Sequence, residues 1–337
     1  MEDKLQLWNW EIADRYIVND IFLIIYIIIG ILGNFLVIII YEFKLKTNRD
    51  DRYFIPWLGL LDLFAGTLRS SFELIRKIYP VMLRGTIFCK VVWMIIDVFA
   101  FSSTCLLLVI AFHRYLKVCR PFGQQMTLPL KKVSLICTFI VSLGMAVILN
   151  SFNSEIPVRN EKFNVTGWTC DIDINDSMGA TFYVFASFAT VAALLIAMGL
   201  AAFYILIARR ICTQIKARND MKSTDLNKET RHLKGYQCKS NCISCVQLSH
   251  TFSFMLMAIA VGYGISYIPQ FVILFLTINN GRFLFGKYDS ETIWISFFRE
   301  MAIINHIINP FIYGLYDKVF RLEVKKIISC HGNEDIV

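Results

Sequence analysis

The sequence predicts an all-α membrane protein, a bundle of seven membrane-spanning helices followed by a short amphipathic eighth helix. Apolar residues make up 56% of the 337 positions and charged residues only 18%, with a mean hydropathy of +0.55. Soluble domains carry about 25% charged residues. The apolar residues form seven runs, each long enough for the roughly 20 residues that a bilayer crossing needs. Most charges lie between these runs.

The runs are continuous rather than alternating, which is typical of helices and not of barrel strands. The first run contains no charged residue. In order, the expected spans are Ile21–Tyr41, Tyr53–Tyr79, Phe88–His113, Val133–Phe152, Ser177–Ala208, Thr251–Asn279 and Thr292–Tyr316.

The segment after the last span is amphipathic. Between Asp317 and Ile328, apolar residues such as Phe320 and Val324 share one face, and basic residues lie on another. This pattern predicts a helix lying on the inner membrane surface, with Cys330 as a candidate for S-palmitoylation. We therefore divide the chain into an N-terminal segment 1–20, a bundle 21–316 and a helix with a tail 317–337.

The distribution of basic residues predicts the orientation. Of the 34 Lys and Arg residues, 22 fall in segments 42–53, 114–132, 209–250 and 317–337, which all lie on one side of seven spans. The positive-inside rule places these segments in the cytoplasm and the N-terminus outside. The net charge of +8 then needs no nucleic-acid partner to explain it, because basic loops face anionic membrane lipid. No cleavable signal peptide is expected.

In this topology only Cys89 and Cys170 face the oxidising side, so they are expected to form a disulfide; two free thiols are the alternative. Asn164 and Asn175 begin N-x-Ser/Thr glycosylation patterns in the same outer loop, 152–178. We expect that loop to cover the mouth of the bundle. No metal site is expected, because the cytoplasmic cysteines fit no familiar zinc spacing.

Five motifs appear in order on the expected spans. Asn309-Pro310-Phe311-Ile312-Tyr313 ends the seventh span, and Cys89 precedes Arg114 by 25 residues on the third. Gly33-Asn34 lies on the first span, and Leu58 with Asp62 on the second. Over residues 21–330 the chain resembles a divergent rhodopsin-like (class A) G-protein-coupled receptor of the peptide-receptor kind.

The resemblance implies a plasma-membrane receptor, not an enzyme, that binds an extracellular ligand and couples to a heterotrimeric G protein, with arrestin as a further partner. Arg114 matches the arginine that receives the G-protein C-terminal helix. The resemblance assigns the remaining coupling residues as Tyr115, Pro121, Phe122, Tyr204 and Tyr313.

The resemblance also implies a polar core around Asp62. A carboxylate in mid-membrane costs on the order of 3 kcal/mol, so it needs partners. The candidates are Asn34, Ser103, Asn305 and Asn309. In the family such a pocket can hold Na⁺, but His306 stands where a small hydroxyl is usual, so water alone is the alternative. Tyr267 and the helix-breaking residues Pro269 and Pro310 complete the expected activation residues, although Tyr267 could equally be ordinary packing.

One departure from the family concerns Arg114. Its neighbour His113 replaces the usual acidic residue, and no Glu lies near Ser249 at the start of the sixth span. We therefore expect no carboxylate to hold Arg114 in the inactive state, and a raised basal activity.

Ionisable residues in the outer halves of the spans are candidates for ligand contact. Amine receptors carry an aspartate at the position of Ile96, whereas in this chain the aspartate is the next residue, Asp97. A peptide ligand therefore fits better than an amine. A small molecule of amine, lipid or chemosensory type is the alternative ligand. A transporter is the alternative function, but the chain shows no internal repeat. The candidate ligand contacts are Arg69, Glu73, Ile96, Asp97, Gln270, Arg299 and Glu300.

Overall fold

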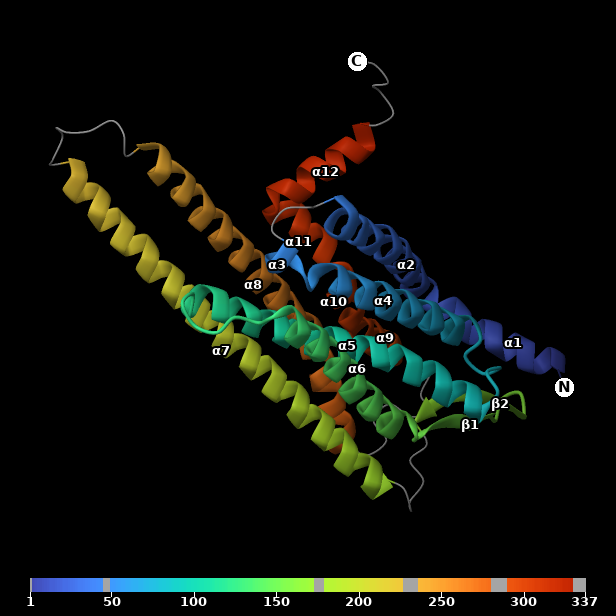
Figure 1. Ribbon diagram of the computed structural model, residues 1–337. Coiled ribbons are helices and arrows are strands. Elements are labelled where there is room, and N and C mark those ends of the chain that lie inside the picture. Colours follow the sequence, from blue (N-terminus) through green and yellow to red (C-terminus); the bar gives the residue numbers. More distant parts are fainter. Residues whose placement is uncertain (1, 45–48, 173–178, 227–235, 280–289, 330–337) are drawn as a thin grey trace.

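The computed structural model describes residues 2–44, 49–172, 179–226, 236–279 and 290–329. Long helices form a bundle with a β-hairpin at one end and helix α12 (Lys318–Ser329) at the other (Figure 1). We call these the hairpin end and the α12 end. The bundle consists of α2 (Ile17–Ile38), α4 (Ile55–Ile78), α5 (Thr86–Cys119), α6 (Leu128–Asn150), α7 (Gly179–Leu226), α8 (Tyr236–Asn279) and a broken last helix of α9 (Ser290–Glu300), η4 (Met301–Ile303), α10 (Ile304–Ile307) and α11 (Asn309–Tyr316).

Five helices in the described ranges are long and apolar enough to cross a membrane on composition alone. The exceptions are α4, which carries several charges, and the broken last helix. The charges of α4 point inward: Asp62, Glu73 and Lys77 are all buried. Its exposed side chains include Trp57 and Phe64. An apolar outer face around buried charges is the arrangement that a spanning helix needs, so all seven expected spans are bundle helices.

The first span is longer than the sequence indicates. Segment 1–20 is expected to precede it, but the chain is helical from α1 (Glu2–Ala13) onward and continues into α2. Trp8 is buried against the hairpin. Asn9 Nδ2 donates a hydrogen bond to Ile78 O at 2.9 Å, which satisfies a carbonyl at the end of α4. Helix α1 is thereby fixed to the hairpin end of the bundle.

The break in the last helix follows from Pro310. Proline has no N–H, so the carbonyl of His306 lacks its usual intrahelical donor. Asn34 Nδ2 supplies the missing hydrogen bond from α2 at 2.8 Å. The Pro310 ring also approaches α2 at Gly33, where a Cβ atom would come within 2.8 Å of Pro310 Cγ. The two helices pack this closely only because residue 33 has no side chain.

The expected loop over the mouth of the bundle is a β-hairpin in an otherwise helical fold. Strands β1 (Asn153–Asn160) and β2 (Val165–Ile172) pair antiparallel. Trp168 N donates to Val81 O at 2.8 Å, which joins β2 to the segment between α4 and α5. A Cβ atom on Gly167 would lie 2.6 Å from Val81 O, so this approach requires glycine. The backbone hydrogen bonds hold the hairpin over the bundle.

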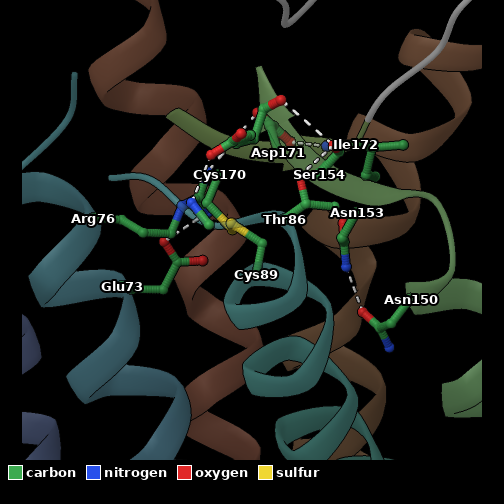
Figure 2. Close-up of a disulfide and its surroundings, with 12 residues drawn as sticks. Glu73, Arg76, Thr86, Cys89, Asn150, Asn153, Ser154, Cys170, Asp171 and Ile172 are labelled. Carbon is green, nitrogen blue, oxygen red and sulfur yellow. Dashed lines mark hydrogen bonds and ion pairs between the residues drawn. A yellow bond between two sulfur atoms is a disulfide. The ribbon is translucent and has the colours of Figure 1, made fainter. Parts of the chain in front are cut away.

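The disulfide Cys89–Cys170 is present, as the sequence predicts, and joins the start of α5 to β2 (Figure 2). Both cysteines are buried. Asn164 is exposed at the turn of the hairpin, where a glycan has room. Asn175 and Cys330 lie outside the described residues.

Replacing Cys89 with Ala should destabilise the hairpin end, because the disulfide closes a loop of 81 residues and such a bridge contributes on the order of 4 kcal/mol. Thermal unfolding of purified protein measures the loss. Cys137→Ala is the matched control, since Cys137 is an exposed free thiol. Recovery of either Cys89 or Cys170 as a free thiol in unreduced peptide maps of surface-expressed protein would contradict the assignment.

Candidate functional site

Buried charges gather beneath the hairpin. Glu73 on α4 is 2% exposed and lies 3.3 Å from Arg76 Nη1 and 3.8 Å from Arg299 Nη2 on α9. Arg76 Nη2 also lies 3.8 Å from Asp171 Oδ2 on β2 (Figure 2). Three elements therefore share one network, and two of the predicted ligand contacts, Glu73 and Arg299, already have charged partners.

A second buried ion pair lies beside the first. Lys77 Nζ contacts Glu300 Oε1, and both side chains are about 5% exposed or less. Ser296 accepts a hydrogen bond from Lys77 Nζ at 2.9 Å. Glu300 is thus bound within the protein rather than open to a ligand. Neither Lys77 nor Ser296 is among the residues predicted from the sequence. Lys77 could have been found, since it is a charged residue within an expected span, one turn after Glu73.

Arg69 differs from its neighbours Arg76, Lys77 and Arg299. Glu73 forms its ion pairs with Arg76 and Arg299, and Arg69 forms no ion pair within the described parts of the chain. Its guanidinium lies over the ring of Trp93, 5.7 Å from the centroid, and its Nε is buried without an acceptor. Gln270 Oε1 on α8 is likewise buried and lacks a donor there. A hydrogen-bond donor and an acceptor are left over inside the bundle.

The two candidates on α5 have different environments. Asp97 Oδ2 accepts a hydrogen bond from Asn150 Nδ2 at 2.9 Å. Asn150 Oδ1 in turn accepts from Asn153 Nδ2 at 2.5 Å, which links this carboxylate to β1 (Figure 2). Ile96 is 1% exposed and packs with Phe72 and the disulfide. Ile96 therefore packs inside the bundle, and its contact with a ligand stays a prediction.

Asp62 is completely buried in the middle of the bundle, and three side chains satisfy it. Ser103 Oγ donates to Oδ1 at 2.6 Å, and Asn309 Nδ2 donates to Oδ2 at 2.6 Å. His306 Nδ1 lies 2.8 Å from Oδ1. The contacts come from α5, α10 and α11, so one carboxylate ties α4 to two other spans.

Two expected partners of Asp62 are elsewhere. Asn34 bonds the carbonyl that Pro310 leaves free, and Asn305 makes no side-chain hydrogen bond within the described residues. The unexpected partner is His306 on α10, which lies one turn before Pro310. On α8, the Tyr267 ring packs 4.8 Å from Tyr263, next to Pro269.

At the α12 end, Arg114 is 1% exposed and has a partner that the sequence analysis did not expect. Arg114 Nη2 donates to the backbone O of Asp51 at 2.6 Å, and Nη1 lies 3.8 Å from Asp51 Oδ1. Asp51 belongs to α3 (Arg49–Arg52), between the first two spans. The expectation that no carboxylate holds Arg114 is wrong, since the acid comes from another element. His113 instead packs its ring edge-on against Phe54, 5.6 Å away.

The two acids of α3 form a small network with α5 and α6. Lys117 contacts both Asp50 and Asp51, and Lys131 contacts Asp50. Burial raises the pKa of Asp50, but hydrogen bonds and charge from Lys117 and Lys131 outweigh it and lower the pKa to about 2. For Asp51, Arg114 and Lys117 outweigh burial in the same way and lower the pKa. The ionised Asp50 carboxylate therefore stabilises the fold fully above the ordinary carboxyl pKa of about 4. This stabilisation is lost only as the pH falls towards 2.

The other predicted coupling residues also lie at this end. Tyr204 and Tyr313 are buried, and the Tyr313 hydroxyl has no partner within the described residues. Tyr115 packs against the ring of Phe203 on α7. Pro121 and Phe122 are exposed in the loop after α5, and Phe122 is fully so.

Comparison with known proteins decides the family. The model of the family described as 7 transmembrane receptor (rhodopsin family) matches residues 33–313. The chain belongs to this receptor family. It is therefore a multi-pass membrane receptor and not an enzyme or a transporter. The residues that carried the resemblance, from Gly33 to Tyr313, bound the matched region.

Two curated relatives are similar to the receptor. It is 23% identical over 304 residues to the tachykinin-like peptides receptor 86C of Drosophila melanogaster, covering 90% of this chain and 56% of that protein. It is 22% identical over 342 residues to neuropeptide receptor 3 of Caenorhabditis elegans, covering 96% of this chain and 83% of the relative. The chain thus spans little more than half the length of the first relative.

Among solved structures, squid rhodopsin matches with a TM-score of 0.71 at 17% identity, covering 96% of this chain and 89% of that one. This likeness supports the seven-helix fold.

The polar core of this receptor does not fit a sodium ion. Hard cations take several oxygen ligands at once. Here both oxygens of Asp62 face nitrogen or hydroxyl donors, and the His306 ring lies at Oδ1. No group of three or more His, Cys, Asp or Glu side chains in the described ranges is placed to hold a metal.

Removing one member of the Lys77–Glu300 pair should destabilise the receptor strongly. Lys77→Met leaves the Glu300 carboxylate buried without its cation, which typically costs about 3–5 kcal/mol. Thermal unfolding in detergent measures the loss, and Lys77→Met with Glu300→Leu should recover most of it. Lys4→Met is the control, because Lys4 is exposed on α1. Equal losses for the single and double variants would show that the pair is not coupled.

Proposed function

We propose that this receptor binds an extracellular peptide at the hairpin end and activates a heterotrimeric G protein at the α12 end. The observation that carries the proposal is that two buried polar atoms inside the bundle lack a hydrogen-bond partner, Arg69 Nε on α4 and Gln270 Oε1 on α8. A ligand with both acceptors and donors, such as a peptide backbone, satisfies them. Both curated relatives are named as peptide receptors, which supports the same ligand class.

The proposed orientation in the plasma membrane has the N-terminus and the hairpin outside. It rests on the sequence, in which 22 of the 34 Lys and Arg residues fall in segments 42–53, 114–132, 209–250 and 317–337. We expect an antibody to label an N-terminal epitope tag on intact, unpermeabilised cells.

The contacts of the acidic residues favour a peptide over an amine. A cationic amine needs a carboxylate that is not already paired with a cation, but Glu73 and Glu300 each form ion pairs within the protein. A lipid ligand needs apolar surroundings, whereas Arg76, Lys77 and Arg299 form a network of ion pairs in this region. A small polar molecule remains the second candidate, and the ligand panel below distinguishes it.

The α12 end offers the G protein a buried cation and an exposed apolar side chain. Arg114 must leave Asp51 before it can meet the carbonyls at the C-terminus of an incoming helix. In this proposal Tyr204 and Tyr313, which are buried at the same end, support the freed guanidinium. Phe122 is fully exposed, so it can dock into a partner without any rearrangement. Arrestin would use the same face.

The proposed ligand contact of Arg69 can be tested with a panel of peptides and small molecules in a cell-based G-protein activation assay. Arg69→Gln should weaken the active ligand by about 10- to 100-fold, since a hydrogen bond to a charged group contributes about 1.5–3 kcal/mol. Arg159→Gln is the control, because Arg159 is exposed on β1. Activation by no peptide but by a small molecule would reject the peptide class. An unchanged half-maximal concentration for Arg69→Gln would reject the contact.

The proposed restraint on Arg114 predicts the basal activity. Asp51→Asn keeps the backbone contact but removes the carboxylate charge, which is about one-third exposed, so ligand-free signalling should rise by up to about fivefold. Asp50→Asn is the matched control, because Asp50 contacts Lys117 and Lys131 and not Arg114. G-protein activation is compared at matched surface expression. Equal rises for both variants would show that general disruption of α3, not the Arg114 contact, sets the output.

A further inference from the structure

An apolar groove runs along the outer surface of the bundle where α2, α11 and α12 meet. Its volume is about 450 Å³, within the range of sites that hold small molecules. Leu32 and Leu36 line it from α2, Phe311 and Gly314 from α11, and Val324 from α12. We call this space the α2–α12 groove. The only charged side chains among its lining residues are Arg321 and Lys325.

The groove arises from two features of the backbone. Gly314 has no side chain, and a Cβ atom built there would meet nothing within 4 Å. Helix α12 turns away from α11 at Asp317, whose Oδ1 accepts from Val319 N at 2.9 Å and so begins the new helix. Arg52 and Tyr41 also bind Asp317, at 3.0 and 2.8 Å. These contacts fix the angle of α12, so the groove exists before anything binds.

The basic residues at the edge of the groove are not neutralised by carboxylates in the described part of the chain. Arg321 Nη1 donates to Gly314 O at 3.1 Å, which holds the guanidinium at the end of α11. Neither Arg321 nor Lys325 forms an ion pair with a carboxylate in the described part of the chain. Lys326, on the same helix, differs because it contacts Glu323 at 2.7 Å. The groove edge therefore carries two uncompensated positive charges.

The occupant must match both an apolar trough and two cations at one end. Lys and Arg side chains bind phosphate oxygens through charge-assisted hydrogen bonds. Basic residues on an amphipathic helix at a membrane surface attract anionic lipid, and each contributes about a fivefold preference. A neutral lipid or a sterol would fill the trough but would give neither cation an anionic partner.

We propose that the α2–α12 groove binds an anionic phospholipid from the membrane leaflet that faces α12. An acyl chain lies between Leu32 and Phe311, and the phosphate group lies at Arg321 and Lys325. The site depends on the fold and the membrane, and not on which ligand or G protein the receptor uses.

Native mass spectrometry of the full-length, delipidated receptor tests the site, with phosphatidylserine and phosphatidylcholine titrated separately. The unaltered receptor should bind phosphatidylserine more tightly than phosphatidylcholine. Arg321→Gln with Lys325→Gln should weaken phosphatidylserine binding by about 25-fold, and Lys325→Gln alone by about fivefold. Lys326→Gln is the matched control and should leave binding unchanged. Equal binding of the two lipids, or no effect of Lys325→Gln, would overturn the proposal.

A second pair of variants tests the trough itself. Gly314→Trp should fill the groove and abolish the preferred phosphatidylserine adduct. Gly144→Trp is its control, because Gly144 is an exposed glycine on α6 that also has nothing within 4 Å. Persistence of the adduct in Gly314→Trp would place the lipid elsewhere and overturn the proposal. A further outcome would also overturn the proposal. If lipid binds only to the Cys330→Ser variant, an acyl chain attached to Cys330 occupies the groove in the unaltered receptor. Unfolding temperatures within a few degrees of the parent show that each variant is folded.

Discussion

The structure depends on satisfying one buried carboxylate. Asp62 lies in mid-bundle where water is scarce, and a carboxylate there is stable only if donors reach both oxygens. Ser103, His306 and Asn309 provide those donors from three other segments. Because the side chains that carry these donors are short, their helices must approach α4 closely. The relative positions of α4, α5 and the last helix follow from this requirement.

The break at Pro310 makes that arrangement possible and has consequences in two directions. Inward, it leaves the carbonyl of His306 free for Asn34, and the ring of the same histidine contacts Asp62. Outward, the proline ring rests against Gly33, and the helix beyond it ends in the turn that starts α12. One residue without an N–H therefore shapes both the polar core and the apolar groove on the lipid-facing surface.

Charge is used differently at the two ends of the bundle. Beneath the hairpin, Arg76, Arg299 and Lys77 hold the acids Glu73 and Glu300, whereas Arg69 forms no ion pair in the described parts of the chain and is the cation proposed to meet a ligand. At the α12 end, Arg114 is held by Asp51, an acid on a short exposed helix. A contact of this kind can be broken without unfolding the core, whereas the buried pairs at the hairpin end cannot. This difference suits a rigid binding site coupled to a switchable one.

The sequence by itself determined the seven spans, the disulfide, the polar residue Asp62 and the family, because hydropathy, cysteine placement and motif spacing are properties of local sequence. It did not determine which charges pair. Glu73 lies one turn from both Arg69 and Arg76, and only the position of α9 decides that Arg76 and Arg299 take it. Likewise, Asp51 meets Arg114 across more than 60 residues of chain. Partners far apart in sequence are selected by how helices pack and rotate, which only the tertiary structure decides.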